Sequence, residues 1–218
     1  MYGLKYFFAE EFFNLAENSY HKHSHPLLKY QVKKDFVQLL KLLKNYHFET
    51  YRHSINVARL SFLISQELGI STDEIIATTI GGLLHDIGKI KINPLLLCKS
   101  AKLTQSEWDL IKKHPHFGVH ILSAFSWGNK ISPIISYHHE RIDGNGYYGL
   151  KGDNIPLGSR IISIADAYEA MVSPRPYQKS LSLSESWQEI KNNSGSQFDP
   201  KLVQILIKIT SKYHFIIS

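Results

Sequence analysis

The feature that most constrains the fold is a helical spacing of apolar residues that continues through nearly the whole chain. No run shows the alternation of apolar and polar residues that is typical of a half-buried strand. Three helix starts carry a capping-box pattern, namely Ser71 with Glu74, Thr104 with Glu107, and Ser182 with Glu185. The sequence therefore predicts an all-α helical bundle without internal repeats.

Glycine and proline predict where several helices end or begin. A helix from about Glu49 to Leu68 should end at Gly69, as a C-cap glycine would end it. The helix that starts after Thr104 must break near His114-Pro115, because proline cannot continue a helix. The later elements are predicted as a helix over Ile131–Glu140, a tight loop over Asp143–Gly146, an apolar helix over 159–172 and a last helix that starts at Asp199-Pro200.

The first 45 residues are predicted to be a helical appendage or connector, and residues 46–218 the main domain. Amphipathic helices are expected over residues 4–18 and from Leu27 to about Asn45. Between them, the run His21–Pro26 is better interpreted as a polar turn ended by proline than as a surface metal site. The sequence leaves open whether these helices dock a partner, form a homodimer or cover the bundle.

Charge and cysteine content narrow the class of protein. The chain of 218 residues has a net charge of +6, which favours acidic partners such as nucleotides. Its lysines are dispersed along helices, so a groove for a nucleic acid polymer is not expected.

The single cysteine, Cys98, excludes an internal disulfide and is expected to be buried and structural. The N-terminus resembles neither a secretory signal nor a membrane span, so cytoplasmic residence is expected.

The stretch Thr79–Lys89 places a histidine, an aspartate and a lysine where an apolar helix ends. Neutral imidazole and carboxylate are both good ligands for divalent transition ions, and Asp86 has two oxygens with which to bridge two ions. Lys89 lies one turn beyond His85 and can bring a positive charge to the same place. A lone His-Asp pair is more often a satisfied core histidine beside a capping aspartate, so the hypothesis of a metal site depends on the rest of the chain.

Further potential ligands follow in order along the sequence. Glu49 and His53 are spaced i, i+4 and project from one helical face. His114 stands at a helix break, His138 and His139 are adjacent, and Asp166 interrupts an apolar helix. Each has an ordinary structural explanation when taken singly, such as a helix cap or a paired buried carboxylate. Together they would need eight unrelated explanations for groups that are costly to bury unpaired.

The ordered motifs resemble those of the HD-GYP family, a subgroup of the HD phosphohydrolase superfamily. The resemblance covers about Glu49 to Pro200 and rests on HDIGKI, HPHFG, HHERIDGNGY, GDNIPLGSRIISIADAYEAMVS, RPYQKSLS and GSQFDP. It implies an HD-domain helical bundle with two or three metal ions, for which the implied ligands are Glu49, His53, His85, Asp86, His114, His138, His139 and Asp166. Glu49 matches the acidic ligand of members that hold three ions rather than two. His47, His116 and His120 match no ligand position.

The resemblance also implies residues that act on substrate. Lys89 matches the active-site lysine, and Arg175 and Lys179 match basic residues that contact substrate phosphates. Gly146 and Tyr147 belong to the loop that helps with substrate or partner contacts. One departure falls in this loop: where the family has Gly-Tyr-Pro, this chain has Gly146-Tyr147-Tyr148, and the loop is one residue shorter. Tyr148 restores a backbone N–H that proline lacks, so specificity and partner recognition are open at this position.

The chemistry implied is hydrolysis of a phosphodiester. Histidine and carboxylate ligands without thiolate suit iron or manganese better than zinc. Our hypothesis is that Asp86 bridges two ions, that the hydroxide between them attacks phosphorus, and that Lys89 assists. The substrate implied by the resemblance is cyclic di-GMP, opened to pGpG and carried on to GMP. The alternatives are a phosphohydrolase for another nucleotide, or a signalling module that binds a cyclic dinucleotide or a diguanylate cyclase without turnover.

Overall fold

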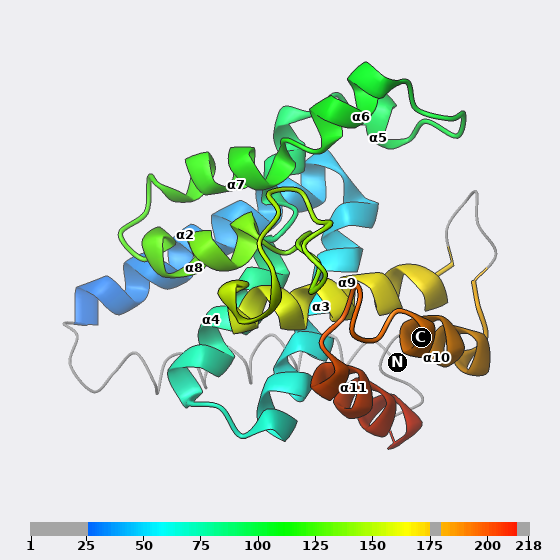
Figure 1. Cartoon of the computed structure of the whole chain (residues 1–218). Helices are drawn as coiled ribbons and strands as arrows, with labels where there is room; N and C mark the ends of the chain where they lie inside the picture. Colours follow the sequence, from blue (N-terminus) through cyan, green and yellow to red (C-terminus); the bar gives the residue numbers. More distant parts are fainter. Residues whose placement is uncertain (1–25, 175–179, 213–218) are drawn as a thin grey trace.

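The computed structural model describes residues 26–174 and 180–212, with side chains from residue 34 onward (Figure 1). The described elements are the α-helices α2 (Pro26–Tyr46), α3 (Phe48–Leu68), α4 (Thr72–Leu84), α5 (Pro94–Leu97), α6 (Gln105–Ile111), α7 (His114–Leu122), α8 (Gly128–Ser136), α9 (Leu157–Val172), α10 (Leu183–Asn192) and α11 (Pro200–Lys212), with the 3₁₀ helices η1 (Ile87–Lys91) and η2 (Gly152–Asn154). Within these ranges the only β contact is an isolated bridge between Ser194 and Phe198. The all-α prediction is confirmed. Four predicted features lie outside the described residues: the helix over 4–18, most of the run His21–Pro26, Arg175 and Lys179.

All three predicted capping boxes are present. At the start of α4, α6 and α10 the hydroxyl of the N-cap residue accepts the backbone N–H of the glutamate three positions on, and that glutamate accepts the N-cap N–H in return. Each box satisfies N–H groups that have no partner within their own helix. α3 ends at Gly69, whose φ of 67° lies in the left-handed region that glycine adopts without steric cost.

The chain also breaks between α6 and α7 as proline requires, because Pro115 lies in the first turn of α7. One predicted boundary is wrong. The helix expected to reach Glu140 ends at Ser136, although Pro133 is accommodated inside it. The imidazole Nδ1 of His138 lies 2.6 Å from the Ile135 carbonyl oxygen, which a continuing helix would give to a later backbone N–H. His138 and His139 therefore lie in a turn after α8.

The central helix is α3, which packs against α2, α4, α9 and α11 (Figure 1). On one side its residues join α9, α10 and α11 in an apolar core around Leu60, Ile64 and Tyr168. On the other side, Ala58 joins α2, α4 and α8 in a second core around Leu84 and Ile135. The two cores fix the ends of α4 and α8 next to α3 and α9.

Helix α2 packs into the second core. Its Phe36 ring stacks on Trp127 with the ring centroids 4.5 Å apart, and the Trp127 Nε1–H donates to Asp35 Oδ2 at 3.3 Å. Leu39 and Leu43 of the same helix are buried. The division of the chain at residue 45 stays a prediction, since α2 is anchored in the core while residues 1–25 lie outside the described part. None of the described helices is both long and apolar enough to cross a membrane.

The expectation for Cys98 is wrong, because its side chain is exposed. Cys98 follows α5, a helix of four residues none of which is buried. α5 lies at the surface, and the chain is still at the surface where it reaches Cys98. The Cys98 thiol instead lies 3.4 Å from Nε2 of His47.

Candidate metal centre

Six of the predicted ligands form two groups in which the ligand atoms lie within 4.8 Å of one another. The first, which we call the His85 group, consists of His53, His85 and Asp86. The second, the His139 group, consists of His114, His138 and His139. The six side chains come from α3, from the end of α4, from the start of α7 and from the turn after α8. Segments far apart in the sequence thus supply a single concentrated set of nitrogen and oxygen ligands.

Three of the histidines are oriented by the same device. The Nδ1 atoms of His85, His114 and His138 lie 2.8, 2.8 and 2.6 Å from the carbonyl oxygens of Gly82, Ile111 and Ile135, each three residues earlier. A carbonyl oxygen only accepts, so each Nδ1 carries the proton and donates it. The three carbonyls lie in the last turn of α4, α6 and α8, where the helix leaves them without a partner. This bond leaves each Nε2 with its lone pair available for a metal ion.

The Nε2 atoms are placed as a cation requires. Among the described residues, the buried Nε2 of His85 has no hydrogen-bond partner. The Nε2 atoms of His114 and His138 face each other at 3.2 Å, and with both Nδ1 atoms protonated both are acceptors. Two buried lone pairs this close are unfavourable unless a cation lies beside them. The donor set therefore fits divalent metal ions, and metal ligation would satisfy all three nitrogens.

Asp86 belongs to the His85 group and also faces the His139 group. Its Oδ1 is 3.3 Å from His114 Nε2, whereas its Oδ2 is 3.5 Å from His85 Nε2 and 4.0 Å from His53 Nε2. Lys89 Nζ donates to the same Oδ2 at 2.6 Å. Burial alone would raise the pKa of the Asp86 carboxyl, but Lys89 and the surrounding histidines outweigh it and hold the pKa well below its usual range. Asp86 is thus a buried carboxylate with one oxygen toward each group.

His53 is held between two carboxylates of α9. Its Nε2 is 2.9 Å from Asp166 Oδ1, and its Nδ1 is 2.5 Å from Glu169 Oε2. Burial opposes protonation of His53, but the hydrogen bonds to Asp166 and Glu169 raise its pKa to about 9. A divalent ion at His53 Nε2 would displace that proton. Asp166, a further predicted ligand, therefore contacts the His85 group through His53.

Glu169 is a functional candidate that the sequence reasoning missed. It is buried, and besides His53 it accepts from Asn56 Nδ2 at 3.0 Å and from the Ser173 hydroxyl at 2.6 Å. A carboxylate on the far nitrogen of a ligand histidine fixes its tautomer and its orientation. The signal was its spacing, since Glu169 lies three residues after Asp166 on the same helix and Asn56 three after His53.

Burial keeps the His139 group neutral. It lowers the pKa of His114 to about 3 and that of His139 to about 4, and lowers the pKa of His138 well below its usual range. Burial also lowers the pKa of His85. These imidazoles are therefore neutral at pH 7, which is the form that binds a metal ion.

Glu49 lies apart from both groups. It is in the first turn of α3, its side chain is 51% exposed, and it accepts from Arg52 Nη2 at 2.5 Å. This matches the ordinary alternative of a charge at a helix N-terminus. The third-metal role that the resemblance implies for Glu49 stays a prediction.

The loop after α8 covers the His139 group. The Tyr147 ring lies against the His139 ring with the centroids 4.6 Å apart. Gly146 packs on the backbone of Glu140, where an added Cβ would lie 2.5 Å from the Glu140 Cα.

The Tyr148 N–H, which proline would lack, donates to Glu140 Oε1 at 2.7 Å, and the Leu150 N–H donates to Oε2 at 2.6 Å. Glu140 was also missed by the sequence reasoning, and it fixes the loop in which the chain departs from the family motif.

Comparison with known proteins assigns the family. The sequence profile described as HD domain matches residues 38–202. The chain therefore belongs to the HD domain family, as the HD-GYP resemblance of its motifs predicted. It is 37% identical over 184 residues to a cyclic di-GMP phosphodiesterase of Thermotoga maritima, covering 80% of this chain and 49% of that protein. It is 34% identical over 167 residues to the 3'3'-cGAMP-specific phosphodiesterase 1 of Vibrio cholerae, covering 76% and 39%.

A solved structure agrees with the fold. An HDG"Y"P protein from Bdellovibrio bacteriovorus superposes with a TM-score of 0.60 at 25% identity, covering 73% of this chain and 51% of that one. The chain spans about half the length of the first relative and of this structure.

Proposed function

We propose that this chain is a metal-dependent phosphodiesterase that hydrolyses cyclic di-GMP to the linear dinucleotide pGpG and further to GMP. The observation that carries the proposal is the position of Asp86, whose two oxygens face different histidine groups. A carboxylate placed in this way suits a bridge between two ions. The activities named for the Thermotoga and Vibrio relatives support a cyclic dinucleotide as the substrate class.

The metal ions would be held by residues of both groups. His53, His85 and Asp86 would hold one ion with Asp166, and His114, His138 and His139 would hold the other with Asp86. Nitrogen and carboxylate ligands without thiolate favour iron or manganese over zinc. Bound ions would supply a hydroxide nucleophile at neutral pH and neutralise charge that develops on the phosphate.

The chain's own residues would position the substrate and the developing charge. Lys89 lies 2.6 Å from Asp86 and about one-quarter of its side chain is exposed, so its ammonium can contact both the carboxylate and a bound phosphate. Tyr147 lies against His139 and, with Gly146 before it in the same loop, is proposed to contact the substrate. Arg175 and Lys179, outside the described residues, are proposed to bind the substrate phosphates.

The test is anaerobic reconstitution of the chain with iron or with manganese, followed by chromatography of the products from cyclic di-GMP. We expect pGpG first and GMP later, with loss of activity on chelation. A panel with 3'3'-cGAMP and nucleoside monophosphates separates the proposal from a phosphohydrolase for another nucleotide. A metal-loaded chain that hydrolyses none of these would refute the proposed activity.

The second candidate is a signalling module that binds a cyclic dinucleotide or a diguanylate cyclase domain without turnover. The feature that favours it is Tyr148 in place of the family's proline, which gives the loop a different backbone bond and an exposed ring. Binding of cyclic di-GMP by the metal-loaded chain without any product would decide for this candidate. A homodimer through residues 1–45 also stays a prediction.

A further inference from the structure

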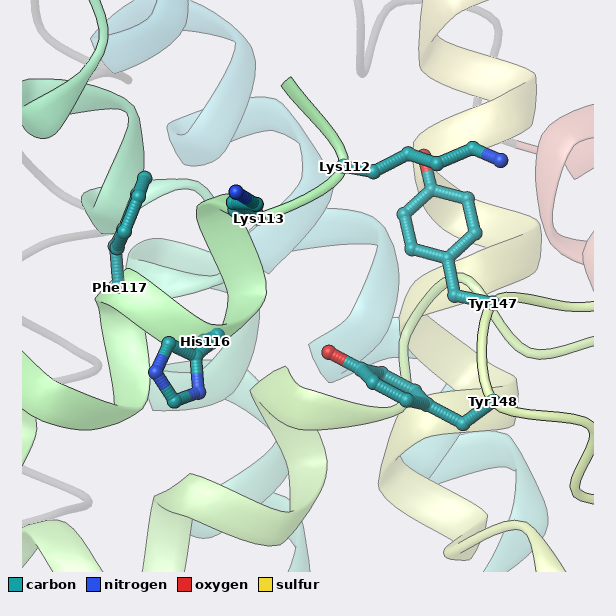
Figure 2. Close-up of a pocket in the computed structure, with 6 residues that line it drawn as sticks. All are labelled: Lys112, Lys113, His116, Phe117, Tyr147 and Tyr148. Atoms are coloured by element: carbon teal, nitrogen blue, oxygen red, sulfur yellow. The ribbon is translucent and has the colours of Figure 1, made fainter. Parts of the chain in front are cut away.

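A pocket of about 580 Å³ opens beside the His139 group. Its size falls in the range of roughly 300–1,000 Å³ that is usual for small-ligand sites. It is lined by Lys112, Lys113, His116, Phe117, Tyr147 and Tyr148 (Figure 2). Apart from Tyr147, none of these residues has a role in the metal centre or in the substrate contacts proposed above.

The pocket is built from two segments that also carry ligands. Lys112 and Lys113 directly precede His114, and the two tyrosines come from the loop after His138 and His139. Figure 2 shows the tyrosines on one side of the pocket and His116 with Phe117 on the other. The Tyr147 ring lines the pocket and lies against the His139 ring, so the pocket adjoins the metal centre. A ligand bound at the metal centre could therefore extend directly into the pocket.

The lining combines aromatic faces with positive charge. Lys112 Nζ lies 5.5 Å from the centroid of the Tyr147 ring and 5.6 Å from that of Trp108, so both rings hold its ammonium at the rim. Lys113 is exposed, and no carboxylate is among the lining residues. Aromatic rings stack on nucleobases and ammonium groups attract phosphates, so this lining suits a nucleotide.

Tyr148 is exposed yet fixed. Tyr148 is 52% exposed, so part of its ring is accessible to a bound molecule. Its backbone N–H is held by the buried Glu140, and its ring meets Tyr137 edge-to-face with the centroids 5.8 Å apart. A ring held in place before binding loses little conformational entropy when a base stacks on it.

We propose that this pocket binds the nucleotide half of the substrate that does not lie at the metal centre, with its purine on Tyr148 and its phosphate against Lys113. The inference rests on the proposed function in that it takes a cyclic dinucleotide as the substrate. Such a molecule carries two purines and two phosphates. When one phosphate lies at the metal centre, the other nucleotide needs partners next to that centre, and the pocket supplies both a base platform and a cation.

The experiment compares variants of the full, manganese-loaded chain. Tyr148→Ala and Lys113→Ala remove the ring and the ammonium, Tyr148→Phe keeps the ring, and Lys191→Ala removes an exposed lysine of α10. Two measurements are made: steady-state kinetics with cyclic di-GMP and with bis(p-nitrophenyl) phosphate, and calorimetric binding of GMP. The second substrate is a small phosphodiester that needs only the metal centre.

We expect Tyr148→Ala to raise KM for cyclic di-GMP and to weaken GMP binding by about tenfold, the usual loss when a stacking ring is removed. Lys113→Ala should raise KM by about fivefold, and Tyr148→Phe and Lys191→Ala should match the parent chain. Hydrolysis of bis(p-nitrophenyl) phosphate should be unchanged in all four variants. This pattern separates a nucleotide pocket from damage to the metal centre.

The outcomes distinguish this inference from the proposed function. If cyclic di-GMP is hydrolysed and neither KM nor GMP affinity changes in Tyr148→Ala, the pocket assignment is overturned and the phosphodiesterase stands. If Tyr148→Ala slows both substrates equally, the ring supports the metal centre and the pocket assignment is again overturned. If no substrate is hydrolysed but GMP affinity still depends on Tyr148 and Lys113, the pocket stands and the phosphodiesterase does not.

Discussion

The two histidine groups of the metal centre differ in part in how their ligands are oriented. In the His139 group, His114 and His138 donate to the backbone carbonyls of Ile111 and Ile135. In the His85 group, His53 donates to the carboxylate of Glu169, while Asp86 is held by Lys89. His85 also donates to a helix-end carbonyl, that of Gly82. The His139 group therefore depends on where helices end, whereas the His85 group depends on charged side chains as well.

This difference teaches which changes each group can tolerate. A backbone carbonyl remains when a neighbouring side chain is replaced, so His114 and His138 should lose their orientation only when the packing of α7 or α8 is disturbed. A carboxylate is lost by one substitution, so a change at Glu169 should weaken the His85 group through His53. Substitutions in each group test this separation through metal binding or stability, and for Asp86→Ala through turnover as well.

The largest effect is expected from Asp86→Ala, because Asp86 has an oxygen toward each group. Loss of a supporting residue around a metal typically costs 10–100-fold in affinity, so loss of a shared ligand should cost more than ~100-fold. We expect elemental analysis to find both ions depleted and product analysis to find no hydrolysis. Undiminished hydrolysis of cyclic di-GMP by this variant would defeat the assignment of Asp86 as the bridge.

Gly88→Ala should disturb the His139 group through the backbone. A Cβ at Gly88 would lie 1.9 Å from the carbonyl oxygen of His114 and 2.6 Å from the backbone N of Gly118, so η1 and α7 must separate. We expect a loss of ~3 kcal/mol or more in the free energy of unfolding. Urea denaturation of the metal-free chain measures it.

Gly118→Ala is the matched control for this change. Its Cβ would lie 3.1 Å from the Cδ1 of Ile135, the end of a side chain that can shift, so we expect a loss of ~1 kcal/mol or less. Equal losses for the two variants would mean that the contact between η1 and α7 is less tightly packed than the distances indicate.

Glu169→Ala should weaken one group and spare the other. Without the carboxylate, the imidazole of His53 loses the acceptor that fixes its orientation, and affinity for one ion should fall by roughly 10–100-fold. Glu169→Gln keeps one acceptor oxygen and should lose less. Calorimetric titration with manganese resolves the two tight binding steps, and a change in both of them, or in neither, would contradict the separation of the groups.

The same contrast explains what the sequence could predict. Helix starts at Ser71, Thr104 and Ser182 depend on residues three positions apart, so their capping boxes were predicted and found. The end of α8 was predicted wrongly, because no proline or glycine marks it. Instead, the His138 side chain binds the Ile135 carbonyl oxygen that the next turn of helix would use. The exposure of Cys98 depended on the shortness of α5, which periodicity did not predict.

The candidate ligands could be predicted from their motifs, but the carboxylates that hold a ligand or the neighbouring loop in place could not. Glu169 contacts His53, which precedes it by 116 positions, and Glu140 contacts the N–H of Tyr148, which follows it by 8 positions. Such contacts exist only once α3 packs against α9, or once the loop folds back on the turn after α8. A carboxylate inside an apolar helix was a usable signal for Asp166 and, three residues later, for Glu169 as well.

The smallest effect is expected from Glu49→Ala, which tests the number of ions. Glu49 pairs with Arg52 on the surface, and such exposed pairs stabilise by no more than about 1 kcal/mol. A third cation near His53 could therefore draw Glu49 away from Arg52 at little cost. We expect manganese titration of the parent chain to show two tight steps and one weaker step, and Glu49→Ala to remove only the weaker one.

Arg52→Ala is the matched partner in this test, because it frees Glu49 and should strengthen the third step by a few-fold. If the parent chain and both variants all show the same two steps, the centre is dinuclear and Glu49 is only a charge at the N-terminus of α3. Loss of all steps in Glu49→Ala would instead mean that Glu49 turns inward when metal binds, and that the His85 group includes a ligand from the first turn of α3.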